Sequence, residues 1–279
     1  NIDAEISGSL SDGEFDVTEK DAVVAFPAYF EQAFVVRKGS FNGEWHYSDE
    51  HLQFILQDID LRDDDFDVDA EMALDVPVND PMGTQINIMG GFNFFDSTKV
   101  KHYLPLKIFS PAVSEWISNA IVSGENVHGT TVMRGSARDF PYKKHEGTFY
   151  IDSFIEPVTF NYDATWPAIN NLSADLVFRN SGMHIKTKSG DTDGIKFESA
   201  SADIADLSHK PVLKITGKTH ESSNDVLEFI HQSPLDSTVG QWLKPFDVTG
   251  PLAMLLELTL PLTDEDAIEV NGQLEFLGD

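Results

Sequence analysis

The densest set of potential metal ligands in this chain is an acidic run that begins at Asp63 and continues to Asp75. Carboxylates at alternate positions resemble the start of a calcium-binding loop, where they coordinate the ion. The run lacks the central glycine of such a loop, and the twelfth residue from Asp65 is Val76, where a bidentate glutamate is needed. The sequence therefore predicts no calcium site here, and the alternation needs another explanation.

The other reactive residue types form no recognisable constellation either. His145 and Glu146 have no second histidine at helical spacing, and His46 and His51 are interpreted as exposed histidines near a turn. The chain has no cysteine and no glycine pattern typical of nucleotide binding or of a nucleophile elbow. A carboxylate pair for glycoside hydrolysis stays open, because 47 acidic residues allow many pairs, but none stands out. The sequence predicts that the protein is not an enzyme and that it has no metal site and no cofactor.

The charge balance narrows the possible partners. The chain of 279 residues has 47 acidic and 19 basic residues, a formal net charge of −28. Such a surface repels phosphate backbones and offers no polybasic patch to anionic lipid headgroups, so nucleic acid is not an expected partner. No stretch approaches the roughly 20 apolar residues of a membrane-spanning helix. Because the chain starts at Asn1 without methionine, we expect it to be a piece of a longer protein.

Residues 65–76 explain the acidic run as one long strand. The even positions from Phe66 to Val76 are apolar, and five of the six odd positions are acidic. Successive side chains of a strand point to opposite faces, so the segment has one acidic and one apolar face. At about 3.3 Å per residue it would extend roughly 40 Å, about twice the usual strand. A one-sided strand of this length favours a long open sheet that is apolar on one side.

Similar alternation predicts an antiparallel meander on both sides of a helical segment. Further strands are expected at residues 4–10, 14–18, 33–47, 51–61 and 84–95, and from 127 to about 219. A bulge or sharp bend is expected at Gly90-Gly91. A short helix is expected over 98–104, and a longer one over 111–123, capped by Ser110 and ended by Gly124. A helix pair followed by strands recurs after Ser222, which indicates an imperfect repeat of about 120 residues.

Several turn and packing motifs resemble one family. They are Tyr103-Leu104-Pro105, the helix around Trp116, Phe140-Pro141-Tyr142, Gly147-Thr148-Phe149, residues 166–172 and 174–183, and a second block from Ser233-Pro234-Leu235 through Val248-Thr249-Gly250 to Leu262. In these motifs the chain resembles the YhdP family of AsmA-like proteins, firmly over residues 100–279 and by pattern only over 1–99. None of the motifs is catalytic.

The resemblance implies a large envelope protein of Gram-negative bacteria that is anchored in the inner membrane and crosses the periplasm. Such proteins are bridge-like lipid carriers built from repeating β-groove units, along which phospholipids move between the inner and outer membranes. The implied fold is mainly β: a long, twisted and curved antiparallel sheet that forms an open groove, with a few short helices. We expect three segments in one continuous sheet: residues 1–100, 101–221 and 222–279.

Alternation and resemblance together predict which side chains line the groove and contact phospholipid acyl chains. They are Phe66, Val68, Met72, Leu74, Phe149, Ile151, Leu172, Leu176, Phe178, Leu256, Leu258 and Leu260. An alternative stays open: a closed β-sandwich of the cell envelope with a structural or ligand-binding role, for example in binding glycans. The sequence does not indicate the preferred lipid, the direction of transport or the partner proteins.

Overall fold

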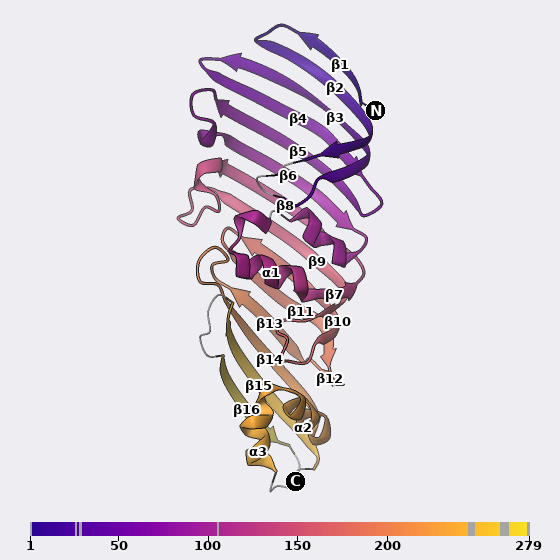
Figure 1. Ribbon diagram of the computed structural model, residues 1–279, viewed down its shortest axis with the longest axis vertical. Coiled ribbons are helices and arrows are strands. Elements are labelled where there is room, and N and C mark those ends of the chain that lie inside the picture. The colour runs from indigo at the N-terminus through magenta and orange to yellow at the C-terminus, as the bar shows by residue number, and fades with distance from the viewer. Residues whose placement is uncertain are drawn as a thin grey trace. The chain divides into compact units, whose positions relative to one another are not determined.

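The computed structural model describes residues 2–25, 27, 30–104, 106–244, 249–262 and 268–277 (Figure 1). Pro105 and Val248, both part of the motifs above, lie outside these residues. The strands are β1 (Ile2–Gly8), β2 (Asp12–Val24), β3 (Phe34–Ser48), β4 (His51–Arg62), β5 (Phe66–Pro77), β6 (Gln85–Phe94), β7 (Ile121–Gly124), β8 (Val127–Ser136), β9 (Thr148–Phe160), β10 (Ile169–Arg179), β11 (Gly182–Thr192), β12 (Ile195–Lys196), β13 (Ser199–Ile204), β14 (Val212–Ser222), β15 (Pro251–Pro261) and β16 (Glu269–Phe276).

The helices are few and short. Three are α-helices: α1 (Pro111–Ala120), α2 (Ser223–Gln232) and α3 (Val239–Leu243). The 3-10 helices are η1 (Pro81–Gly83), η2 (Ser97–Tyr103), η3 (Leu106–Ile108), η4 (Ala137–Asp139) and η5 (Pro234–Ser237). Within the described residues, no helix is long and apolar enough to span a bilayer.

The described strands form one 16-stranded antiparallel sheet, in the order β1-β2-β3-β4-β5-β6-β8-β9-β10-β11-β13-β14-β15-β16. The two remaining strands pair at its side, β7 with β9 and β12 with β11. The order starts at β1 and ends at β16, so the sheet is open, and the predicted mainly-β class is confirmed. The closed sandwich is wrong for the part of the chain that the structure describes, because those strands belong to a single sheet.

Contacts divide the chain into two compact units. Unit 1 comprises Asn1–Lys107, Val127–Ser153 and Val177–Ser181, and unit 2 comprises Ile108–Asn126, Phe154–Leu176 and Gly182–Asp279. The predicted three-segment division stays a prediction.

In unit 1 the strands follow one another as hairpins. β5 pairs with β4 and β6, and β6 pairs directly with β8, so the segment between β6 and β8 connects two neighbouring strands. The bulge predicted at Gly90-Gly91 is wrong, because the β5–β6 register runs unbroken through both glycines. A Cβ at Gly90 would lie 2.6 Å from the Asp69 carbonyl oxygen, so the position requires glycine for close strand approach. The register instead shifts in β3–β4, between Ser40 and Asn42, and in β4–β5, between Leu56 and Ile59.

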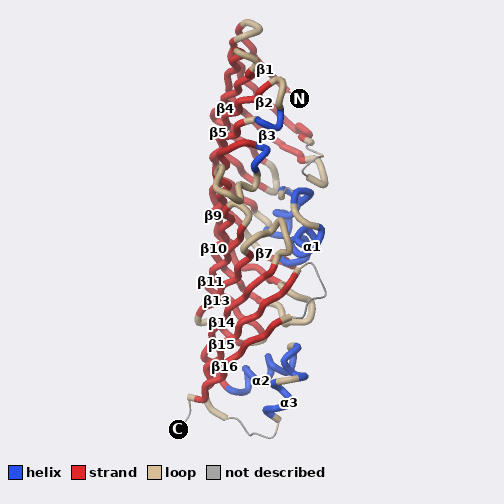
Figure 2. The backbone as a smooth tube through the Cα atoms, turned by 90° about the vertical axis from the view of Figure 1, so that its left-hand side faces the viewer, coloured by secondary structure: helices blue, strands red, loops and turns tan. Residues whose placement is uncertain are grey.

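In unit 2 the helix α1 is shorter than expected. The Ser110 hydroxyl caps α1 by accepting the Val113 N–H at 3.4 Å, but α1 ends at Ala120, not at Ser123. Ile121 and Val122 are β-branched and favour a strand, and β7 pairs with β9. The second predicted helix pair is present as α2 followed by η5 and α3, inserted between the paired strands β14 and β15. Figure 2 shows α2 and α3 on one side of the strands beside them.

Candidate functional site

Unit 1 carries rows of apolar side chains on one face of its sheet. On β5, Leu74 lies opposite Phe54 of β4 and Ile86 of β6. Met72 and Val68 have apolar partners on the same two strands, so the rows run across the sheet. Side chains directly opposite each other stand about 4.5–5.5 Å apart, so each row is a continuous apolar surface. Val68, Met72 and Leu74 are only half-buried.

The opposite face of unit 1 is polar, and ion pairs hold its charges. Asp60 of β4 lies directly opposite Asp69 of β5, which puts two like charges side by side. The Arg62 guanidinium relieves this repulsion, with nitrogen–oxygen distances of 3.0 Å to Asp60 and 2.9 Å to Asp69. The hydrogen bond that Arg62 donates to Asp69 is the main cause that raises the pKa of Arg62. These two carboxylates are therefore ion-paired through Arg62.

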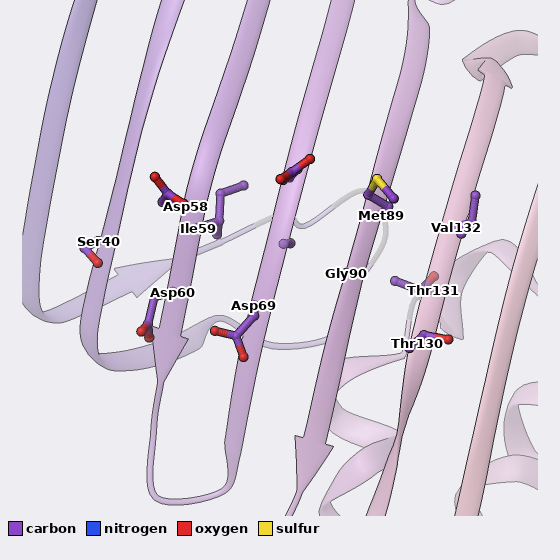
Figure 3. Close-up of a pocket in the computed structure, with 12 residues that line it drawn as sticks. Ser40, Asp58, Ile59, Asp60, Asp69, Met89, Gly90, Thr130, Thr131 and Val132 are labelled. Atoms are coloured by element: carbon purple, nitrogen blue, oxygen red, sulfur yellow. The ribbon is translucent and has the colours of Figure 1, made fainter.

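A hollow of this region also belongs to the polar surface. It has a volume of about 690 Å³, and Figure 3 shows Asp58, Asp60 and Asp69 projecting from β4 and β5 around it. Among the described residues, no group of three or more histidine or acidic side chains could hold a metal ion. Several histidines of the chain instead form pairs with carboxylates, such as His51 with Asp75 at 2.6 Å.

One part of the apolar face in unit 1 is covered by an aromatic cluster. Phe66 is 4% exposed and packs against Phe94 and Tyr103, with ring centroids 6.0 and 5.0 Å away. Phe34 stacks on Tyr103 at 5.5 Å. The Tyr103 hydroxyl donates to Asp65 at 3.3 Å, and burial, with the charges of Asp65 and another aspartate nearby, raises the pKa of Tyr103 to about 12. Phe66 therefore lies beneath η2, while the other predicted lining residues of β5 do not share this cover.

In unit 2 the apolar side chains along β15 are buried. Leu258 is 2% exposed and lies between Ile215 of β14 and Val270 of β16. Helix α2 is packed into the unit through Phe229, whose ring centroid is 6.0 Å from that of Trp166. The capping hydroxyl of Ser222 accepts a hydrogen bond from the backbone N–H of α2 at 3.3 Å and fixes where the helix begins. The same alternating pattern therefore forms a covered core here.

The predicted lining residues thus fall into two groups. Seven are half-buried: Val68, Met72, Leu74, Phe149, Ile151, Leu176 and Phe178. Five are buried: Phe66, Leu172, Leu256, Leu258 and Leu260. The prediction omitted the aromatic side chains Phe41, Trp45 and Phe54, which alternate in the same phase and share the face with Leu74. The alternation of these aromatic residues in the sequence of β3 and β4 is the signal that could have identified them.

Phe149, Ile151 and Phe178 belong to the strands β9 and β10 where these run through unit 1. The Phe149 ring packs edge-on against Phe140 at 5.3 Å, and its N–H donates to the Asn180 side chain at 2.9 Å. These contacts fix the start of β9 without covering its apolar side chains fully.

The chain is 25% identical over 260 residues to the intermembrane phospholipid transporter YhdP of Escherichia coli (strain K12). The match covers 93% of this chain and 20% of that relative, so the chain spans about a fifth of the length of the curated relative. No solved structure matches the chain significantly. The family model described as YhdP protein matches residues 1–277, and the chain therefore belongs to the YhdP family.

Proposed function

We propose that this chain is a segment of a periplasm-spanning protein that conducts phospholipids between the inner and outer membranes. The observation that carries the proposal is the set of half-buried apolar rows on one face of the open sheet in unit 1. Acyl chains lie along these rows, and the headgroups stay in solvent. Each methylene removed from water contributes about 0.8 kcal/mol, so a long chain left in water costs on the order of 10 kcal/mol. An apolar surface along the route lowers that barrier.

The proposed role needs no catalysis and no cofactor. The segment is a passive conduit, and phospholipid acyl chains are its direct partners. Contact with the inner and outer membranes is made by parts of the full-length protein beyond this segment, including an inner-membrane anchor. The name of the relative and the shared family support this role, and the formal charge of −28 disfavours binding to nucleic acid.

The first test is organic extraction of the gently purified chain, followed by lipid mass spectrometry against a mock purification. We expect phospholipid to be enriched on the protein. A monomeric protein free of lipid under these conditions would contradict the proposal.

The second test places a charge on the apolar face. We expect Leu74→Asp combined with Leu176→Asp to abolish lipid recovery, because a carboxylate there must be desolvated by the acyl chain. The matched control is Ala73→Asp with Val177→Asp, which adds the same charges one residue away, on the opposite face of the same strands. If the Leu74/Leu176 variant folds and retains as much lipid as this control, the groove assignment is contradicted.

A further inference from the structure

Unit 2 has a gap in its buried apolar row where two glycines flank a leucine. Leu256 of β15 lies opposite Gly217 of β14 and Gly272 of β16. A Cβ at Gly217 would meet no atom within 4 Å, and one at Gly272 would meet its nearest atoms at 3.9 Å. In unit 1, by contrast, a Cβ at Gly43 would lie 2.7 Å from the Phe15 ring, so that glycine makes room for a neighbour. The two glycines of unit 2 leave space that none of the described residues fills.

This space opens into a cavity between the helical segment α2–η5–α3 and the strands β15 and β16. The cavity has a volume of about 420 Å³, within the usual range of sites for small ligands. Ile230, Leu235, Met254 and Leu274 contribute to its walls. A smaller hollow of about 60 Å³ on the Gly217 side shares Met254 and Leu256 with it.

The chemistry of the walls selects the occupant. Among the residues that the structure describes, no charged side chain lines the cavity. The Thr238 hydroxyl, one of its few polar groups, already donates to the Leu235 carbonyl oxygen at 3.3 Å. A peptide or a sugar would bury polar groups that find no partner on such walls, whereas an aliphatic chain brings none. At the rim, Trp242 is 67% exposed and Phe276 is 53% exposed, so large apolar side chains stand in solvent at the entrance.

We infer that this cavity, named here the unit 2 hollow, binds one acyl chain of a phospholipid beneath α2 and α3. The chain enters past Trp242 and ends against Met254 and Leu256. The inference rests on the proposed function and adds a defined resting site in unit 2, where the apolar row is otherwise covered. In unit 1 the acyl chain lies on an open face, and in unit 2 it is enclosed.

The test uses the complete 279-residue chain and phosphatidylcholine vesicles with a photoactivatable diazirine at the end of one acyl chain. After irradiation, labelled peptides are mapped by mass spectrometry. We expect labels on β15, near Met254 and Leu256, in addition to labels on the open face of unit 1. We expect Gly272→Phe to fill the hollow and to lower the β15 label roughly tenfold, the effect of excluding about two methylenes.

Asn271→Phe is the matched control, because it adds the same ring one residue away on the opposite face of β16. It should leave the β15 label unchanged. Should Gly272→Phe fail to fold, brominated acyl chains offer a second measurement on the unaltered hollow. These chains should quench part of the tryptophan fluorescence, and Trp242→Phe should remove that part.

The outcomes separate the inference from the proposed function. Labels in unit 1 alone would overturn the unit 2 hollow and leave the conduit proposal standing. Labels on β15 that persist in a folded Gly272→Phe variant would also overturn it, as would an absence of quenching at Trp242. An absence of label from both units would overturn both proposals.

Discussion

Truncating one leucine in each unit tests whether the two apolar rows differ as the structure requires. Leu258 is 2% exposed, and Leu74 is half-buried. Replacing leucine by alanine removes three carbon groups, worth about 0.8 kcal/mol each when fully buried. A residual cavity adds to this loss, so we expect Leu258→Ala to lower the free energy of unfolding by about 3 kcal/mol. About half of that transfer contribution applies to Leu74, and no enclosed cavity forms, so we expect Leu74→Ala to cost about 1 kcal/mol.

Hydrogen exchange in increasing urea measures this difference locally. Amides of β5 and β15, resolved by mass spectrometry, report the opening free energies of the two units separately. The variants should therefore shift different sets of peptides. Added phospholipid should raise the stability of β5 by mass action, and Leu74→Ala should reduce that increase.

The reasoning has a clear point of failure. If Leu74→Ala costs as much as Leu258→Ala in lipid-free protein, the row on β5 belongs to a closed core. An unchanged response of β5 to phospholipid in Leu74→Ala would likewise contradict its role as a contact surface.

Three further predictions concern single contacts. The hydrogen bond from His51 is the main cause that lowers the pKa of Asp75. The stabilising effect of this bond is therefore present above the ordinary carboxyl pKa and is lost as the pH falls through the lowered pKa. His51→Ala should raise the pKa of Asp75 in a carboxyl NMR titration. Burial raises the pKa of Tyr103 to about 12 from an unfolded value of about 10, so stability present below pH 10 should decline as the pH rises towards 12. Urea unfolding of Tyr103→Phe should lack that decline. Ser222→Ala should cost about 1 kcal/mol in the urea unfolding of unit 2, because the capping bond to the Asp225 N–H at 3.3 Å is lost, and an unchanged midpoint would show that the cap contributes nothing.

Alternation predicted the strands and their faces well because it is a local property. In β5 the period of two assigns each side chain to a face without knowledge of any neighbour, and Phe66–Pro77 is a strand as expected. Helical spacing, also a local pattern, failed at residues 121–124. The spacing continues there, but pairing with β9 makes the segment a strand. Boundaries of this kind depend on a partner that lies some 40 residues away in sequence.

Burial could not be predicted from the same pattern. Leu74 and Leu258 both belong to runs in which every second residue is apolar, yet only Leu258 is fully buried. Their difference arises from which parts of the chain lie over each strand, a tertiary property that alternation does not encode. The glycines at 217 and 272 are informative in retrospect, because they interrupt apolar alternation where no close approach requires it.

The half-buried row of unit 1 is difficult to explain by folding alone. Polar residues such as threonine at positions like Val68, Met72 and Leu74 would lower the risk of aggregation of a half-exposed strand, at a cost of about 1 kcal/mol each. The chain instead keeps large apolar groups there and places aspartates on the opposite face of the same strand. The acidic face keeps such a sheet soluble, while the opposite face keeps its half-buried apolar side chains. Such a sheet is expected where the partner of the apolar face is a mobile aliphatic ligand. A permanent cover over the apolar face would occupy the surface along which that ligand moves.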